Sequence, residues 1–202
     1  MNEATRWRFA STCAPLLRDD VDTDQIIPAR FLTTTTKTGL GEKLFADWRY
    51  DASGAPRSGF PLNDPAHAGA QVLLAGANFG AGSSREHAPW ALVDYGFRAV
   101  IARSFADIFA GNALKNGLLV IAVGDVAHET LRRSLEGDPK ASVSVDLEAQ
   151  TLTLPDGTRE RFPIDGFMKH MLLEGVDELG YLQGMLPEIA AYEAAQSASP
   201  AG

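Results

Sequence analysis

The chain has 202 residues, of which 45% are hydrophobic and 22% are charged, and its formal net charge is −8 at pH 7. This length and composition are typical of a globular protein with one good core, and they exclude a fibrous or wholly disordered chain. No basic run exceeds the pair Arg132-Arg133, so the sequence gives no sign of the extended basic surface that binds nucleic-acid phosphates. No apolar run approaches the roughly 18 to 20 residues that span a bilayer. The N-terminus also lacks the apolar stretch of a signal peptide, so we expect a cytoplasmic protein.

Cys13 is the only cysteine of the chain. One cysteine cannot close an internal disulfide, build a cysteine-rich zinc site or hold a four-cysteine iron–sulfur cluster. Cluster chemistry would therefore require a partner chain. No histidine-containing motif accompanies Cys13, so we interpret it as a packing residue rather than a nucleophile.

The N-terminal third has few regular elements. Residues 6–13 predict a short strand that closes at Pro15, and the acidic run 19–24 predicts turns in which Asp and Thr side chains bond neighbouring backbone amides. That run lacks the glycine and glutamate of a calcium-binding EF-hand loop. Residues 33–39 are polar and rich in threonine, which predicts an exposed, mobile loop. Residues 51–69 hold three prolines and predict a long irregular connection.

From Gln71 onward, strand and helix patterns alternate. The expected strands are 71–75, 98–103 and 118–123. A glycine-rich turn and then a helix to about residue 95 follow the first strand, a helical or mixed segment at 104–116 follows the second, and a helix at 126–135 follows the third. Strands separated by helix-length segments predict a parallel sheet with right-handed crossovers.

The remaining chain predicts an antiparallel addition to this sheet. The expected elements are a strand at 142–147, a hairpin at 151–162 that turns at Pro155-Asp156-Gly157, and helices at 165–174 and 187–196. We therefore expect one α/β domain over residues 1–196, with a long loop or insertion at 31–69 and a flexible tail at 197–202.

The run Gly76–His87 is the segment most informative about chemistry. It reads GANFGAGSSREH and lies between an apolar strand and a helix. Its glycines allow close backbone approach to a ligand, and the helix start behind them offers N–H donors, so it predicts an anion site. The lysine of a P-loop is replaced by Ser83, and Arg85 stands where a dinucleotide-binding turn has its third glycine. Both nucleotide-binding motifs are therefore disfavoured.

Two interpretations of Ser83 remain open from the spacing alone. Ser83 and Glu86 have the spacing of a helix capping box, which is a common stabilising device. Pro89 instead suits a first helical turn that starts later, which leaves Ser83 and Ser84 in the loop. There they would join Arg85, whose guanidinium matches a small carboxylate in two-point geometry.

Three segments of this chain resemble one known family. Gly80–His87, Arg103–Phe109 and Asp22–Leu32 look like the corresponding motifs of the 3-isopropylmalate dehydratase small subunits, which are similar to the swivelling domain of aconitase. The resemblance covers residues 6–186 and implies a swivelling β/β/α domain with a mostly parallel central sheet, flanking helices and a hairpin. The insertion around residues 47–50 resembles the bacterial form of the subunit.

This resemblance implies a hydro-lyase that isomerises 2-isopropylmalate to 3-isopropylmalate through 2-isopropylmaleate, in leucine biosynthesis. A large partner subunit would carry the [4Fe–4S] cluster, and this chain would bind no metal. By the same resemblance, Ser83 aligns with the base that removes the carbon-bound proton, while Ser84 and Arg85 align with contacts to the substrate carboxylate. No nucleic acid or membrane is expected as a partner.

The resemblance also implies lesser roles for other residues. The loop residues Leu32, Thr33 and Thr34 would help to select the substrate side group, with Leu32 as the contact for the isopropyl group. Relatives often carry a basic residue where Thr33 stands, which weakens a carboxylate contact there. We expect the remaining motif residues to support the loop without contacting substrate; they are Gly80, Gly82, Glu86, His87 and Arg103.

Some alternatives stay open at this point. The chain could serve a related dehydratase of the homoaconitase or methylmalate type, or it could be an organic-acid-binding module without catalysis. Ser83 argues against the binding module, because anion binding alone does not require that hydroxyl. For Arg103, an ion pair with a structural role is the favoured interpretation. Asp107, Asn112 and Asn116 are expected to bond backbone groups.

Overall fold

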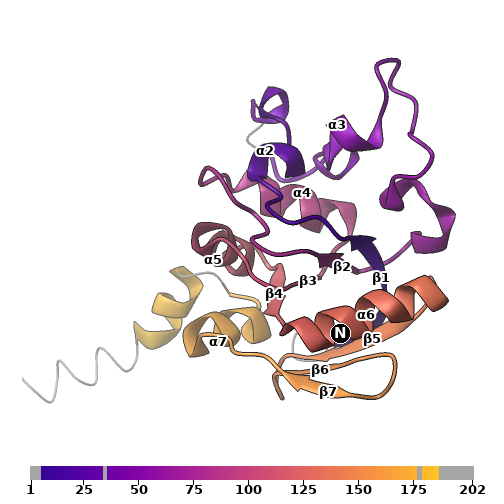
Figure 1. Ribbon diagram of the computed structural model, residues 1–202. Coiled ribbons are helices and arrows are strands. Elements are labelled where there is room, and N and C mark those ends of the chain that lie inside the picture. The colour runs from indigo at the N-terminus through magenta and orange to yellow at the C-terminus, as the bar shows by residue number, and fades with distance from the viewer. Residues whose placement is uncertain (1–5, 34–35, 177–178, 187–202) are drawn as a thin grey trace, which may run out of the picture.

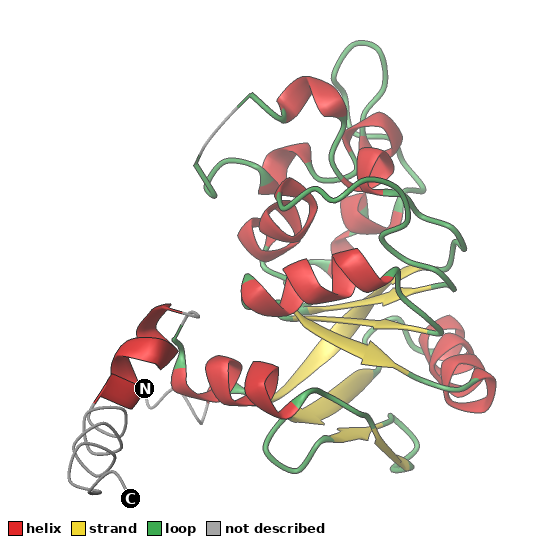
Figure 2. Cartoon of the chain, turned by 90° about the vertical axis from the view of Figure 1, so that its left-hand side faces the viewer, coloured by secondary structure: helices red, strands yellow, loops and turns green. Residues whose placement is uncertain are grey.

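A seven-stranded sheet forms the centre of the molecule (Figures 1 and 2). The computed structural model describes residues 6–33, 36–176 and 179–186. The strand order is β4-β3-β2-β1-β5-β6-β7. The strands are β1 (Arg8–Leu16), β2 (Val72–Ala75), β3 (Ala99–Ala102), β4 (Leu119–Ala122), β5 (Ser142–Asp146), β6 (Thr151–Thr153) and β7 (Arg159–Arg161).

The sheet joins a parallel half to an antiparallel half. Strands β1 to β4 pair in parallel, and β5, β6 and β7 extend the sheet antiparallel beyond β1. The alternating strands and helices from Gln71 therefore form the predicted parallel sheet, and residues 151–162 form the predicted hairpin. The α/β class with flanking helices and a hairpin is as expected, but the seven-stranded sheet is not mostly parallel, because three of its pairings are parallel and three are antiparallel.

Strand β1 belongs to both halves because it changes partner along its length. Arg8–Thr12 pairs with β5, and Cys13–Leu16 pairs with β2. The prediction that this strand closes at Pro15 is wrong, since β1 continues to Leu16. Past Thr12 the strand has a pairing partner on one side only, and such an edge is where a sheet tolerates proline.

Helices cover both faces of the sheet, and four single turns of 3₁₀ helix lie in the long N-terminal connection. The helices are α2 (Thr23–Ile26), α3 (Ala46–Arg49), α4 (His87–Tyr95), α5 (Asp107–Lys115), α6 (Asp125–Gly137) and α7 (Gly166–Glu174), and the 3₁₀ turns are η1 (Ala29–Phe31), η2 (Gly41–Lys43), η3 (Pro61–Asn63) and η4 (Pro65–His67). Figure 1 shows α2 and α4 on one side of the sheet and α6 on the other. Residues 179–186 are also helical.

Two hydrophobic cores result, one on each face. All four residues of β2 are buried, and they alternate between the cores: Leu73 packs with α4 and α5, whereas Leu74 packs with α6. Strands buried on both faces are continuous apolar runs, as parallel strands between helices require. Cys13 lies fully buried in the second core, where burial raises the pKa of its thiol to about 12. The prediction that it is a packing residue is confirmed.

The insertion at 31–69 is held together by polar and aromatic contacts among its own residues. The buried guanidinium of Arg49 donates to the carbonyl oxygens of Gly41 and Leu44, at 3.2 and 3.4 Å, and Phe45 stacks on Trp48 with ring centroids 5.8 Å apart. Residues 51–69 form the expected irregular connection, interrupted by η3 and η4. Thr33 and residues 36–39 are exposed, as predicted for this loop.

The C-terminal helix α7 ends as its sequence indicates. Asp165 caps its first turn, and Gly175 closes it with a φ of 68°. The helix predicted at 187–196 and the tail at 197–202 lie outside the described residues. Within the described ranges, no helix is both long enough and apolar enough to cross a bilayer.

Candidate functional site

The candidate site lies where the parallel strands end. The segments that follow β1, β2 and β3 are joined there by backbone hydrogen bonds, because Gly76 N donates to Arg18 O at 3.1 Å and Phe79 N donates to Ser104 O at 3.1 Å. The carboxyl edge of a parallel sheet is the usual position of ligand sites in α/β proteins. The glycine-rich loop 76–86 thus lies at this edge and leads into α4.

Glycines shape this loop at two close approaches. Gly80 has a φ of 82°, and a β-carbon at that position would lie 2.1 Å from Cγ of Phe109 in α5. Gly82 has a φ of 94°, but its nearest neighbour would be 3.5 Å away. Gly80 is therefore required both by its conformation and by packing, whereas Gly82 is required by its conformation alone.

The segment 21–24 braces the loop from the other side. Gly80 N donates to Val21 O at 2.7 Å, and Thr23 N donates to Ala81 O at 2.9 Å. The hydroxyl of the buried Thr23 also donates to Ser83 O at 3.1 Å. These bonds fix the backbone on both sides of Gly82 and hold Ser83 at a defined place on the edge.

The acidic run 19–24 forms side-chain contacts that shape this edge. Asp19 accepts from Ala77 N at 2.7 Å, Asp20 accepts from Asn78 Nδ2 at 2.8 Å, and Asp22 accepts from Gln25 N at 2.7 Å in a capping box at the start of α2. The prediction that these side chains bond neighbouring backbone amides is confirmed for Asp22, whereas Asp19 and Asp20 bond groups 58 positions away. Their partners include residues of the glycine loop, which are far away in the sequence.

Ser83 and Ser84 are exposed and lie in the loop ahead of the helix. Helix α4 begins at His87, its N-cap is Glu86, and no side-chain hydrogen bond caps it. The capping-box interpretation of Ser83 is therefore wrong, and the interpretation based on Pro89 is confirmed. Pro89 occupies the first turn, where its missing N–H costs no helical hydrogen bond.

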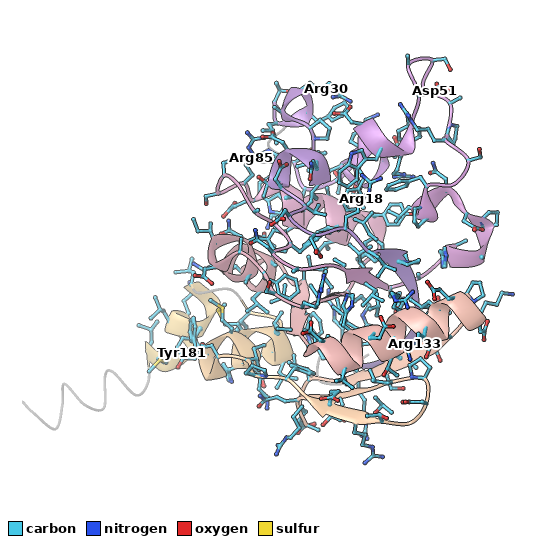
Figure 3. The ribbon with its side chains drawn as sticks, viewed as in Figure 1. Arg18, Arg30, Asp51, Arg85, Arg133 and Tyr181 are labelled. Carbon is cyan, nitrogen blue, oxygen red and sulfur yellow. The ribbon has the colours of Figure 1, made fainter. Side chains whose placement is uncertain are left out.

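Arg85 lies beside the serines and forms an ion pair with Asp24 of α2. The Arg85 side chain is 24% exposed and the Asp24 side chain is 54% exposed. Figure 3 shows Arg85 at the edge of the molecule near the start of the insertion. The contact uses Nη1 of the guanidinium, so further N–H groups of this planar fork can serve a second carboxylate.

Arg103 forms ion pairs that connect three strand ends. Its Nη2 lies 2.6 Å from Asp19 Oδ1, and its Nη1 lies 3.9 Å from Asp125 Oδ1. The hydrogen bond from Ala77 N, and then the one from Arg103, lower the pKa of Asp19. The structure thus supports the ion-pair interpretation of Arg103.

Other predicted residues take different places. Glu86 is exposed, and the ring of His87 lies 4.7 Å from that of Trp90. Leu32 is half-buried against the first core and Thr33 is exposed, while Thr34 lies outside the described residues. The structure therefore tests none of the substrate contacts expected of Leu32, Thr33 and Thr34, which stay predictions.

Asn116 has a larger structural role than predicted. Its Nδ2 donates to Asn112 O at 2.9 Å, as expected of a residue that bonds backbone. Its Oδ1 also accepts from Trp90 Nε1 at 2.8 Å and from Lys37 Nζ at 2.9 Å. Asn116 therefore ties α4 and the threonine-rich loop to the end of α5.

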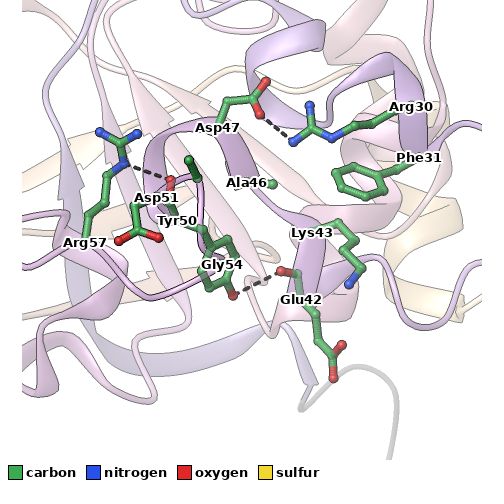
Figure 4. Close-up of a pocket in the computed structure, with 11 residues that line it drawn as sticks. Arg30, Phe31, Glu42, Lys43, Ala46, Asp47, Tyr50, Asp51, Gly54 and Arg57 are labelled. Atoms are coloured by element: carbon green, nitrogen blue, oxygen red, sulfur yellow. Dashed lines mark hydrogen bonds and ion pairs between the residues drawn. The ribbon is translucent and has the colours of Figure 1, made fainter.

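A surface pocket of about 870 Å³ lies in the insertion, away from the serines (Figure 4). Its wall includes Arg30, Lys43 and Arg57 together with Glu42, Asp47 and Asp51. The opposite charges balance, and the Arg30 guanidinium already pairs with Asp47. This pocket thus offers no excess charge to an anion, and the glycine loop remains the better candidate.

With Cys13 as its single cysteine, this chain cannot supply the four thiolates of an iron–sulfur cluster. Cys13 is fully buried, and the described ranges contain no group of three or more His, Cys, Asp and Glu that could hold a metal ion. Two histidines outside the loop have structural contacts: His128 Nε2 lies 2.7 Å from Ala75 O, and the His170 ring lies 5.4 Å from that of Tyr181. The buried Nδ1 of a third, His67, has no hydrogen-bond partner among the described residues.

Comparisons with known proteins agree with this architecture. The family profile of the aconitase C-terminal domain matches residues 7–125, and that of LeuD_N matches residues 129–166. The chain therefore belongs to the aconitase C-terminal domain family, and within it to the small subunits of 3-isopropylmalate dehydratase, as the following relatives show.

The relatives that carry this name include proteins from Anaeromyxobacter sp. (strain K) and Roseiflexus sp. (strain RS-1). The first is 59% identical over 178 residues, which cover 88% of this chain and 91% of the relative; the second is 57% identical over 179 residues, which cover 89% and 88%. A crystal structure of 3-isopropylmalate dehydratase (LeuD) from Methanocaldococcus jannaschii is similar with a TM-score of 0.64 and 28% identity, and the match covers 92% of this chain and 99% of that one.

Separate alanine substitutions at Gly80 and Gly82 test whether packing against Phe109 constrains the loop in addition to its backbone conformation. Gly80→Ala places a β-carbon against Phe109 and forces a left-handed φ on alanine, so we expect a loss of about 2 to 4 kcal/mol in the free energy of unfolding. Gly82→Ala carries the conformational strain alone and should lose about 1 to 2 kcal/mol. Urea unfolding measures both. Equal losses would show that the contact with Phe109 does not constrain the loop.

Proposed function

We propose that this chain supplies the serine base and the carboxylate contacts of a hydro-lyase, which it completes with a large subunit. The reaction is the isomerisation of 2-isopropylmalate to 3-isopropylmalate through 2-isopropylmaleate. The observation that carries the proposal is the exposed pair Ser83-Ser84 beside Arg85, on a braced loop at the carboxyl edge of the sheet. The names of the relatives support isopropylmalate over homoaconitate or methylmalate.

Each half of this reaction moves one proton between carbon and the enzyme. In dehydration, the Ser83 oxygen takes the proton from the carbon next to a carboxylate while the neighbouring carbon loses its hydroxyl. Rehydration returns a proton and a hydroxyl with their positions exchanged. An ordinary serine is a poor base, so its oxygen must be stabilised as an anion by preorganised donors. At the start of α4, Ala88 N already donates to Arg85 O, Trp90 N donates to Glu86 O, and Pro89 has no N–H. The helix therefore contributes through its dipole, which favours negative charge near its N-terminus, and the donors themselves would come from the closed complex.

Arg85 and Ser84 are suited to hold the substrate through a carboxylate. A guanidinium binds a carboxylate with two parallel hydrogen bonds, which fix its orientation as well as its position. Arg85 precedes the first residue of α4 by two positions, so its charge adds to that of the helix start. Substrate held in this way presents its reacting carbon to the adjacent serine.

The exposure of Ser83 and Ser84 indicates that another surface must cover the site. A serine anion is stabilised in a closed site with little water, and this loop is open on the isolated chain. The partner would also carry the [4Fe–4S] cluster, which supplies a Lewis acid to a hydroxyl leaving group. Because this chain has a single cysteine, we assign to it proton transfer and substrate binding. The cytoplasm remains the proposed location.

Three exposed apolar side chains at the carboxyl edge of the sheet mark where the partner would dock, whereas Leu179, Leu182 and Leu186 are exposed on the helical segment 179–186. Val126, Ile108 and Leu17 are 82%, 57% and 42% exposed. They follow β4, β3 and β1, while the serine loop follows β2. They therefore lie at the same edge of the sheet as the serine loop, and apolar surface of this kind favours a protein partner.

Reconstitution tests the function directly. The isolated chain should show no dehydratase activity, and mixing it with a cluster-loaded large subunit should produce both hydration of 2-isopropylmaleate and dehydration of 2-isopropylmalate and 3-isopropylmalate. The absorbance change of the conjugated double bond measures both directions. Turnover by this chain alone would refute the two-chain proposal, and a better rate with another substituted malate would correct the substrate.

Removal of the Ser83 hydroxyl tests its role as a base. In the assembled enzyme, Ser83→Ala should lower kcat by about 10² to 10⁴ and leave KM nearly unchanged, because only the proton-transfer group is lost. Steady-state kinetics measures both constants. Ser83→Gly should behave in the same way, and thermal melting should show both variants folded. Near-normal kcat in the glycine variant would assign the proton to another group.

A charge placed in the apolar edge tests the docking surface. Val126→Asp should weaken binding of the large subunit by about tenfold or more, since it buries an unpaired carboxylate. The fold should persist because aspartate suits the first turn of a helix. Leu182→Asp is the matched control, as Leu182 is exposed on the helical segment 179–186. Isothermal titration calorimetry compares the two. A greater loss for Leu182→Asp would place the interface elsewhere.

A further inference from the structure

We infer that Asp24 is a positioning residue for Arg85, and that it presents the free edge of the guanidinium to the substrate carboxylate. The inference rests on the proposed function, because it assigns a role to the residue that orients the proposed carboxylate contact. Asp24 itself would not touch the reacting atoms. Its effect on the reaction passes through Arg85.

The place of Asp24 is fixed by its neighbours along the chain. Asp22 and Gln25 form a reciprocal capping box around it, with Asp22 N donating to Gln25 Oε1 at 3.0 Å. Thr23 is buried and bonded to the backbone of the serine loop. The carboxylate of Asp24 therefore projects from a segment that is fastened to the same loop as Arg85. The ion pair therefore connects α2 to the start of α4.

The chemistry of the guanidinium explains why a second carboxylate can bind. Arg85 donates to Asp24 through Nη1. The Nε and Nη2 atoms form a separate side-on edge, whose two N–H groups are parallel and match the oxygens of one carboxylate. A fixed counter-ion on Nη1 limits the rotamers of the arginine, so less freedom is lost when substrate binds.

A second exposed pair in the same chain provides a comparison. Arg30 pairs with Asp47, and both side chains are more than half exposed, at 54% and 57%. Surface pairs of this type contribute little to stability. Arg85 differs, because it is only 24% exposed and lies beside Ser83 and Ser84. Asp47→Asn is therefore a matched control that removes the same charge away from the site.

The experiment measures KM and kcat of the assembled enzyme for Asp24→Asn, Asp24→Glu and Asp47→Asn. We expect Asp24→Asn to raise KM by about fivefold or more with kcat within about twofold of the wild type. Asp24→Glu should recover at least half of that loss, and Asp47→Asn should leave both constants unchanged. Thermal melting should show the same midpoint for all three variants within a few degrees.

A double-mutant cycle separates positioning from a merely structural role. If Asp24 acts through Arg85, Asp24→Asn should have little further effect on KM in an Arg85→Lys background. Independent effects of the two substitutions would overturn the inference, and so would an unchanged KM. A lower KM would also overturn it, because it would show that Asp24 competes with substrate. Wild-type enzyme that fails to turn over isopropylmalate would instead overturn the proposed function, and this inference with it.

Discussion

The site depends on the hydrogen bonds that continue the β1–β2 pairing beyond the ends of the two strands. Gly76 N donates to Arg18 O, Asp20 N donates to Ala77 O, and Gly80 N donates to Val21 O, so the two chain segments stay together through the loop. A loop held only at its ends would sample many conformations, and each residue fixed costs about 1 to 2 kcal/mol of conformational entropy. Here that cost is met by folding of the domain before any ligand arrives.

The same bonds place functional groups that are distant in the sequence. They bring α2 to the start of α4, which allows Asp24 to meet Arg85, and they bring Asp19 to Arg103. Both contacts join acids of the 19–24 run to arginines that follow β2 and β3. The acidic run 19–24 thus supplies the carboxylates that pair with the arginines at this edge.

Features that depend on local sequence were predictable, whereas features that depend on tertiary contacts were not. The apolar runs after Gln71 predict the parallel strands because β2 and β3 are buried on both faces. Pro89 predicts the late start of α4 because its constraint is local. The end of β1 was not predictable from Pro15. A strand tolerates proline where it pairs on one side only, and β1 reaches that state where β5 stops pairing with it. The Asp24–Arg85 contact was missed for a similar reason: the pair spans 61 positions along the chain, and local patterns carry no distance information of that kind.

Binding of an anionic substrate depends on the charged groups near the ligand more than on the net charge of the chain. The chain carries a formal net charge of −8, which on average repels a dicarboxylate. At physiological ionic strength, charges beyond about 8 Å are largely screened, so the groups in contact with the ligand dominate. Arg85 and the start of α4 supply positive potential at this range. Asp24 offsets part of the positive charge of Arg85, but it also fixes the orientation of the guanidinium. An oriented guanidinium distinguishes a planar carboxylate from other anions better than a mobile point charge does.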